Sequence, residues 1–246
     1  MSNEFSACVI IIGNEILSGR TQDANLAYIG KRCDELGIRL TEARVIADDE
    51  TTLIDTVNHY RANFDYVFTT GGIGPTHDDI TSASVALAFA KKIIRHPDAV
   101  AVMDDYYDTG QLTEARLKMA DVPEDAILID NPVSAAPGFQ LENVFVLPGV
   151  PVIMQAMFDG IADRLAGGEP MLTANVATNL GESMMAKELG LVQARYPAIS
   201  IGSYPYFRKG KIGVNLVLRG TDADLLDAVK GALHDMIGSL GGEVVV

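Results

Sequence analysis

The residues that most restrict the fold are six consecutive apolar residues, at positions 7–12, which are followed at once by Gly13. A strand with one face in water alternates apolar and polar side chains, whereas a strand buried on both faces is apolar throughout. Strands of the second kind belong to parallel sheets that have helices on both faces. The run therefore predicts a parallel sheet inside an α/β domain.

Helix and strand patterns alternate in the residues that follow. Apolar residues recur at helical spacing in residues 26–36, and residues 38–46 alternate as a second strand. Residues 53–60 carry a second helical pattern, residues 66–70 form a third strand, and residues 85–89 belong to a further helix. This order predicts an α/β fold with a doubly wound, mostly parallel sheet.

The pattern becomes less regular after the third helix. Residues 96–123 are polar and aromatic, and we expect them to form a helical excursion. Strands are predicted at residues 126–129 and 144–147. A closing helix is predicted at residues 151–165, because a proline stands at its first position.

An Ala-Gly-Gly-Glu-Pro segment at residues 166–170 then interrupts the pattern, and we predict a domain boundary there. The expected domains are residues 1–168 and 169–246. The second domain has the order strand, helix, strand, strand, helix, strand, which is typical of a small α+β ferredoxin-like domain. Its elements are predicted at residues 172–178, 182–194, 199–203, 211–218, 222–239 and 242–246.

Composition and charge restrict the partners. The 246 residues carry a formal net charge of −14, which disfavours binding to nucleic acid and to an anionic membrane surface. The two cysteines lack metal-type spacing and fit a reduced, cytoplasmic setting. The apolar run at residues 7–12 is too short for a signal peptide or a membrane span. We expect a small-molecule ligand, no nucleic-acid or membrane partner, and a homo-oligomer.

The residues with most chemistry are 69–81, which read Thr-Thr-Gly-Gly-Ile-Gly-Pro-Thr-His-Asp-Asp-Ile-Thr. Glycines at the carboxyl end of a strand let the backbone turn sharply and bring N–H groups close to a ligand. Asp78 and Asp79 follow at the expected start of a helix, whose N-terminus suits phosphate. Because carboxylates repel phosphate and the loop has no Lys or Arg, we predict a divalent cation between the two.

A second interpretation of Asp79 stays open. Thr76 and Asp79 have the spacing of a capping box, in which the carboxylate only closes the first turn of a helix. The glycines in front and the doubled acid favour a ligand site.

Three other loops follow predicted strands, at residues 13–20, 131–139 and 147–151. In open α/β sheets, ligands bind outside the carboxyl ends of the strands. Each loop alone is weak evidence, but together they predict a pocket lined by backbone N–H groups at one edge of the sheet.

Four motifs in these loops resemble a known family. They are Gly-x-Glu-x-x-x-Gly at residues 13–19, Thr-Gly-Gly-x-Gly-Pro-Thr-x-Asp-Asp-x-Thr at 70–81, Ala-Pro-Gly-Phe at 136–139 and Leu-Pro-Gly-Val-Pro at 147–151. They are similar to the molybdopterin-binding domain of the competence/damage-inducible protein A (CinA) family and to the N-terminal domain of FAD synthases. MoaB and Mog proteins share a more distant version. The resemblance covers most of residues 7–165, and residues 201–205 resemble the second domain of these proteins.

The resemblance implies a molybdopterin-binding-like fold that binds a pterin or nucleotide, with Asp79 near a metal. We assign catalysis to Asp79 and Asp78, and a divalent metal (Mg²⁺, Mn²⁺ or Co²⁺) to Asp79, Asp78 and Glu15. Molybdopterin is the other cofactor that the resemblance implies. The expected substrate-binding residues are Gly13, Glu15, Gly19, Asn25, Gly71, Gly72, Gly74, Pro75, Thr76, Thr81, Gly138, Pro148 and Gly149.

Two functions follow from the resemblance. One is metal-dependent hydrolysis of the pyrophosphate of a nucleoside-diphosphate compound such as ADP-ribose, and the other is a non-catalytic pterin- or nucleotide-binding module linked to molybdenum cofactor metabolism. Asp78 stands where Mog-type loops carry Arg, which counts against adenylylation of molybdopterin. Ile153 and Met119 stand where CinA-type sequences carry Glu and Gln. We expect neither nicotinamide mononucleotide deamidation nor FAD synthesis, because no segment resembles the domains responsible.

Overall fold

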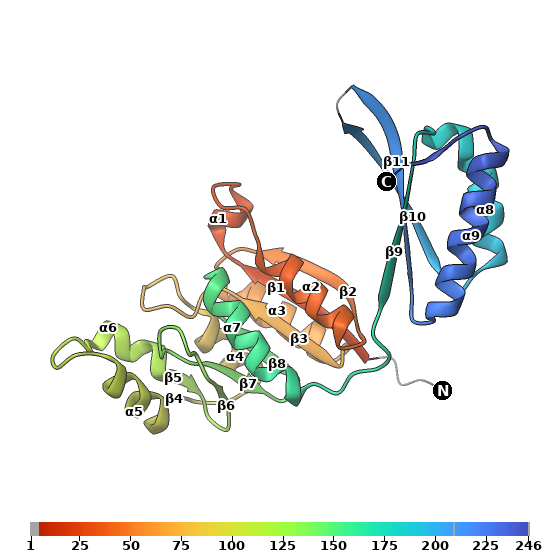
Figure 1. Ribbon diagram of the computed structural model, residues 1–246. Coiled ribbons are helices and arrows are strands. Elements are labelled where there is room, and N and C mark those ends of the chain that lie inside the picture. The colour runs from red at the N-terminus through yellow and green to blue at the C-terminus, as the bar shows by residue number, and fades with distance from the viewer. Residues whose placement is uncertain (1–4, 209, 246) are drawn as a thin grey trace. The chain divides into compact units, whose positions relative to one another are not determined.

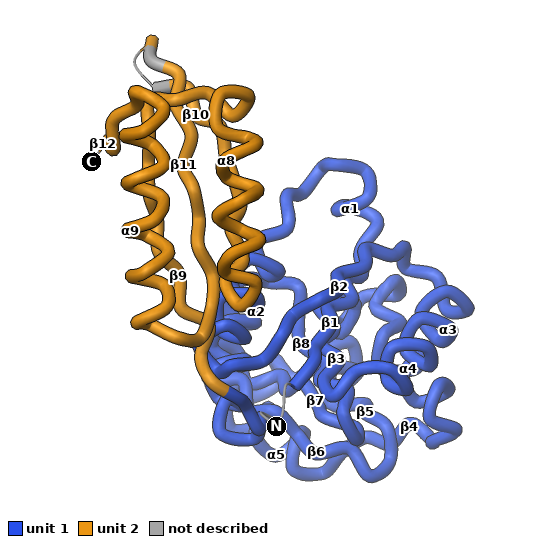
Figure 2. The backbone as a smooth tube through the Cα atoms, turned by 90° about the vertical axis from the view of Figure 1, so that its right-hand side faces the viewer, with its two compact units in different colours: residues 1–168 blue, residues 169–246 orange. Residues whose placement is uncertain are grey.

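The computed structural model describes residues 5–208 and 210–245 (Figure 1). Contacts between Cα atoms divide the chain into two compact units, Met1–Gly168 and Glu169–Val246 (Figure 2). Unit 1 is an α/β domain with a mostly parallel sheet, and unit 2 is a small domain with an antiparallel sheet. The predicted fold class is confirmed.

The central sheet of unit 1 has six strands. Their order is β2 (Ile38–Ile46), β1 (Phe5–Ile12), β3 (Tyr66–Thr70), β8 (Val144–Leu147), β7 (Gly138–Leu141) and β6 (Ile127–Ile129). The first four strands are mutually parallel, whereas β7 runs antiparallel to both of its neighbours. Strand β6 therefore runs in the same direction as β8.

Helices cover both faces of this sheet. One layer contains α2 (Asn25–Glu35) and α7 (Pro151–Ile161), and the other contains α3 (Glu50–Arg61) and α4 (Thr81–Ala88) (Figure 1). Successive side chains of a strand point to opposite faces. Odd-numbered residues from Ala7 to Ile11 accordingly pack in the core with α2 and α7, and even-numbered residues from Cys8 to Ile12 pack in the core with α3 and α4. This is why β1 is apolar throughout.

The excursion between α4 and β6 is partly helical. It contains β4 (Ile93–Arg95), α5 (Pro97–Tyr106), α6 (Glu114–Leu117), a 3-10 turn η1 (Lys118–Ala120) and β5 (Asp121–Pro123). Strands β4 and β5 form an antiparallel pair that the sequence analysis did not predict. With three residues each, they are too short to show a two-residue period. The short helices α1 (Asn14–Leu17) and η2 (Ala162–Arg164) complete unit 1.

Unit 2 has the predicted element order. It contains β9 (Leu172–Thr178), α8 (Glu182–Arg195), β10 (Ser200–Arg208), β11 (Lys211–Gly220), α9 (Ala223–Ser239) and β12 (Val244–Val245). The antiparallel sheet has the order β10-β11-β9-β12, and its core includes Val176, Leu216 and Leu233. Among residues 5–208 and 210–245, no helix has the length and apolar character needed to cross a membrane.

The last residues of unit 1 are hydrogen-bonded to the rest of that unit. The Gly168 N–H donates to the Gly37 carbonyl oxygen (3.2 Å), and the Ala166 N–H donates to the Tyr66 hydroxyl oxygen (2.8 Å). A Cβ atom on Gly167 would lie 1.8 Å from the Leu36 carbonyl oxygen. The glycine at position 167 is therefore required by space, and the segment belongs structurally to unit 1.

We predict that residues 1–168 fold alone and that Gly167→Ala destabilises this fragment. The added methyl group has to displace backbone, so the free energy of unfolding should fall by about 1–3 kcal/mol. Gly160→Ala is the matched control, because nothing lies within 4 Å of its added Cβ inside α7. It should raise the free energy of unfolding by roughly 0.5–1 kcal/mol. Urea denaturation measures both, and equal effects of the two substitutions would contradict the packing at Gly167.

Candidate functional site

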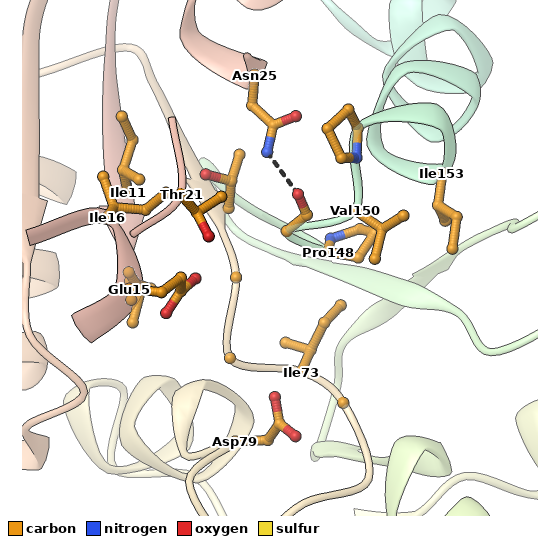
Figure 3. Close-up of a pocket in the computed structure, with 18 of the residues that line it drawn as sticks. Ile11, Glu15, Ile16, Thr21, Asn25, Ile73, Asp79, Pro148, Val150 and Ile153 are labelled. Atoms are coloured by element: carbon orange, nitrogen blue, oxygen red, sulfur yellow. Dashed lines mark hydrogen bonds between the residues drawn. The ribbon is translucent and has the colours of Figure 1, made fainter. Parts of the chain in front are cut away.

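A pocket opens at the carboxyl ends of the parallel strands of unit 1 (Figure 3). Its volume is roughly 610 Å³, which is within the range of small-molecule sites. The residues after β1, β3 and β8 line it, together with residues of the loop after β6. Because β6 runs in the direction of β8, its loop reaches the same edge. Strands β2 and β3 pair with opposite edges of β1, so the chain reverses its direction across the sheet at this point. The pocket therefore lies at a topological switch point of the sheet.

Gly71 and Gly72, in the glycine loop after β3, have no room for side chains. Gly71 has φ +103°, and a Cβ atom there would lie 2.3 Å from the Ile12 carbonyl oxygen of β1. Gly72 has φ +69°, and its Cβ would lie 2.2 Å from the Thr81 hydroxyl oxygen. Both glycines are required for the loop to pass this close to β1 and α4.

The sequence analysis expected Asp78 and Asp79 at the start of a helix, but neither residue lies in one. Helix α4 begins at Thr81, and Asp78 and Asp79 lie in a turn before it. The Asp79 carboxylate Oδ2 accepts hydrogen bonds from the Thr76 N–H (2.8 Å) and from the Thr76 hydroxyl (2.5 Å). The bond from the Thr76 N–H is one half of a capping box. The Thr76 hydroxyl donates to the carboxylate and does not accept from the Asp79 N–H, so the two bonds close a turn inside the loop. No hydrogen bond from the described residues reaches Oδ1.

The sequence analysis missed a cation beside the turn of residues 76–79, which we call the acidic turn. Lys118, from the excursion, donates through Nζ to the carbonyl oxygens of Thr76 and Asp79, the latter at 3.0 Å. Lys118 does not line the pocket. It stabilises the backbone of the turn, and only the folded chain brings it there, across about forty residues of sequence.

Glu15 lies on α1 and lines the pocket. Its carboxylate lies over the backbone of Gly13, where a Cβ atom would be 2.5 Å from Glu15 Oε1. The Gly13 N–H donates to the Ile46 carbonyl oxygen (3.1 Å), which fixes the end of β1. Glu15 and Asp79 both border the pocket (Figure 3).

Carboxylates dominate the charge of the pocket wall, and among the described residues no Lys or Arg lines it. The acidic residues are Glu15, Asp23, Asp48, Asp78 and Asp79. Two of them serve the loops: Asp23 accepts from the Leu26 N–H and Asp48 from the Asn14 N–H, each at 2.9 Å. Asp79 also serves its loop, but only through Oδ2, so the candidates to meet a ligand are Glu15, Asp78 and Oδ1 of Asp79.

The described residues contain no group of three or more His, Cys, Asp or Glu side chains arranged to hold a metal ion. The expected trio of Glu15, Asp78 and Asp79 is therefore not assembled as a closed cage. Asp78 is exposed, with a carboxylate oxygen 3.9 Å from Nδ1 of the exposed His77. The arrangement suits Mg²⁺, which is commonly held by one or two carboxylates together with substrate phosphates and waters.

The cysteines are not candidates for catalysis. Cys8 and Cys33 are buried in the two cores of unit 1. Burial raises the pKa of each thiol to about 12, so both stay protonated at neutral pH.

Part of the pocket wall is apolar. Ile16, Ile73, Val150, Met119 and Ile153 all line it. Ile153 and Met119 are the positions at which the chain departs from the CinA pattern, so both departures face the ligand space. These side chains suit the flat face of a purine or pterin ring.

Most of the expected site residues lie at the pocket. Those that line it are Gly13, Glu15, Asn25, Gly71, Gly72, Gly74, Pro75, Asp78, Asp79, Pro148 and Gly149. Gly19, Thr76, Thr81 and Gly138 do not. Gly19 is exposed, Thr76 closes the acidic turn, and Thr81 is buried with its hydroxyl donating to the Gly71 carbonyl oxygen (3.0 Å).

Gly138 was expected in a ligand-binding loop, but it is the first residue of β7. A Cβ atom there would lie 2.3 Å from the Val146 carbonyl oxygen of β8, so its small size serves strand packing. The loop from the same motif still reaches the pocket through Asn131, Ser134 and Ala136. Thr70 also lines the pocket. Neither Thr70 nor Asn131 was among the expected substrate-binding residues, although both lie in segments that were predicted to form the pocket. The sequence signal that could have identified Thr70 and Asn131 is their position at, or just after, the end of a predicted strand.

Comparison with known proteins places the chain in a family. The family described as "Probable molybdopterin binding domain" matches residues 8–167, and "FAD synthase, middle domain" matches residues 170–241. A protein of Archaeoglobus fulgidus is 36% identical over 197 residues, which are 80% of this chain and 84% of that protein. A CinA-like protein of Desulfosudis oleivorans is 33% identical over 207 residues, 79% of this chain and 50% of the relative, so this chain spans about half of that relative.

A solved structure agrees with these matches. The crystal structure of the protein CinA from Thermoplasma acidophilum is 35% identical and superposes with a TM-score of 0.62, covering 66% of this chain and 99% of that one. Together with the match over residues 8–167, this shows that the chain belongs to the probable molybdopterin-binding domain family, among CinA-like proteins.

Proposed function

We propose that unit 1 binds the pyrophosphate of a nucleoside-diphosphate compound, such as ADP-ribose, through a divalent cation and hydrolyses it. One observation carries the proposal: the pocket pairs a glycine loop at a strand end with five carboxylates, and no described Lys or Arg lines its wall. Backbone N–H groups attract phosphate and carboxylates repel it. A bound divalent cation removes this conflict.

The residues of the chain have separate roles in this proposal. Asp79, with help from Asp78 or Glu15, would hold the cation, because no hydrogen bond from the described residues reaches its Oδ1. The cation supplies charge neutralisation and a more acidic bound water. The N–H groups of the loop with Gly72 and Gly74 would stabilise charge that develops on phosphoryl oxygens. Lys118 holds the turn so that the Asp79 carboxylate keeps its position.

The second candidate is a binding module without catalysis. Its support is that Ile153 and Met119, which replace the Glu and Gln of the CinA pattern, both line the pocket. Two apolar side chains at these places reduce the number of groups able to orient an attacking water and enlarge the surface for a ring. The ligand would then be a nucleotide or a pterin, in keeping with the molybdopterin-binding description of the family. Assembly into a homo-oligomer and a cytoplasmic setting stay predictions.

The reaction itself is tested by product analysis. We expect purified full-length protein, incubated with ADP-ribose and Mg²⁺, Mn²⁺ or Co²⁺, to release AMP above the level of a protein-free control. ATP with molybdopterin should yield no adenylylated pterin, because Asp78 presents negative charge to a second anionic substrate. Binding of ADP-ribose without any AMP would favour the non-catalytic module.

Metal dependence of binding is a separate prediction. In a partly dehydrated pocket with five carboxylates, repulsion opposes a bare pyrophosphate. Calorimetric titration with ADP-ribose should therefore give measurable affinity in Mg²⁺ and an affinity at least about tenfold lower in excess EDTA, equivalent to about 1.4 kcal/mol. Equal affinities in the two buffers would remove the metal bridge from the proposal.

Asp79→Asn tests the carboxylate directly. The amide oxygen can still accept from Thr76, so the free energy of unfolding should change by less than about 1 kcal/mol, while metal-dependent binding is lost. Thr76→Val is the matched control, because it removes one bond of the turn and keeps the carboxylate. It should lower stability by about 1 kcal/mol and leave binding largely intact. If Asp79→Asn only destabilises and still binds, Asp79 is a turn residue.

A further inference from the structure

Asn25, the first residue of α2, has half of its amide unused. Its side chain is 3% exposed and lines the pocket. Nδ2 donates to the Gly149 carbonyl oxygen (2.9 Å), whereas Oδ1 has no hydrogen-bond partner among the described residues. A carbonyl oxygen only accepts, so the contact with Gly149 fixes which end of the amide is the nitrogen. The structure therefore leaves a defined, buried and unpaired acceptor on a side chain that lines the pocket (Figure 3).

Asn131, a second buried asparagine in the same pocket, shows that the unused oxygen of Asn25 is not a general property of this wall. Asn131 Nδ2 donates to the Ser134 hydroxyl oxygen (2.8 Å) and to the Ala136 carbonyl oxygen (2.7 Å). Its Oδ1 accepts from the N–H groups of Val133 and Ser134, each at 3.0 Å. Asn131 is fully used by its own loop, whereas Asn25 is not.

Thr70 adds a second unused group. It is the last residue of β3, it is 1% exposed, and it lines the pocket. Its hydroxyl has no partner among the described residues. Buried polar groups in native proteins are nearly always hydrogen-bonded, so unpaired ones at a pocket wall point to a ligand.

We propose that Asn25 Oδ1 and the Thr70 hydroxyl hydrogen-bond to the ligand, and that Asn25 selects ligands that carry an N–H or O–H donor outside the pyrophosphate. The inference rests on the proposed function. An amide oxygen cannot pair with ionised phosphate oxygens, because neither side has a proton to donate. A donor on the ring or the sugar meets this requirement, whereas an ionised phosphate oxygen does not. Asn25 and Asp79 lie on opposite sides of the pocket, with Ile73 between them (Figure 3). The side of the pocket where Asn25 would accept a hydrogen bond from the ligand is therefore away from the Asp79 carboxylate.

A double-mutant cycle on full-length protein in excess Mg²⁺ tests the role of Asn25. The probes are ADP, the purine ribonucleoside diphosphate that lacks the amino group, and the 2′-deoxy and 3′-deoxy forms of ADP. One of these analogues should bind the wild-type protein about tenfold more weakly than ADP, while Asn25→Ala should bind that analogue and ADP within about twofold of each other. The analogue that shows the coupling tells whether the donor is on the ring or the sugar.

Asn131→Ala is the control for disturbed loops. It should lower the affinity for all four probes by the same factor. The ratios between the four affinities should therefore equal those of the wild-type protein. If wild-type protein binds ADP but Asn25→Ala discriminates between the probes as wild type does, the role of Asn25 is overturned and the proposed function stands. If wild-type protein binds none of the probes, the proposed function and this inference fall together.

Thr70→Val and Thr69→Val form a matched pair for the hydroxyl. Thr69 is equally buried and its hydroxyl also has no partner among the described residues, but it does not line the pocket. Neither variant loses a protein hydrogen bond, so neither should lower the midpoint of thermal unfolding. Thr70→Val should weaken ADP binding about fivefold or more, and Thr69→Val should leave it unchanged. Equal ADP affinities in the two variants would overturn the role of Thr70.

Discussion

The burial of β1 on both faces is the constraint on which the rest of unit 1 depends. A strand covered by two helix layers must satisfy its backbone through neighbours on both edges, and β2 and β3 occupy those edges in parallel. Because the chain goes from β1 to β2 on one side and returns to β3 on the other, the loops after β1 and β3 diverge above the sheet. Gly71 then passes so close to the end of β1 that no side chain fits. The pocket is a consequence of this central strand.

Charge gives the pocket its chemical character. In the proposed function, the backbone of the glycine loop offers N–H groups to an anion, while the charged side chains that line the pocket are carboxylates. Lys118 donates to the backbone of the acidic turn and does not line the wall. A phosphate ligand and a divalent cation are therefore expected to depend on each other. The unused Oδ1 of Asn25 belongs to a residue across the pocket from Asp79, and as an acceptor it is expected to disfavour ionised phosphate at that end.

Much of this was predictable from the sequence, and the reasons for the failures are physical. The apolar run of β1, the helical spacing in α2 and the element order of unit 2 were read correctly, because burial imposes a period on each of them. Strands β4, β5 and β7 were missed because each is too short to show a period and includes a polar residue, glycine or proline, whereas the equally short β6 and β8 are apolar throughout. Gly138 was assigned to the site because it shares a motif with a loop, but it serves strand packing. The contacts of Lys118 and Asn25 with distant loops depend on the fold and carry no local signal.

The most direct test of the account is whether metal and nucleotide meet at the glycine loop. Amide NMR spectra of ¹⁵N-labelled protein can be recorded with Mn²⁺ alone, with ADP alone and with both. The account predicts that paramagnetic broadening of the Gly13, Gly71, Gly72 and Gly74 signals is strong only when Mn²⁺ and ADP are present together. Broadening that ignores ADP, or that spares these glycines and affects another region, would contradict it.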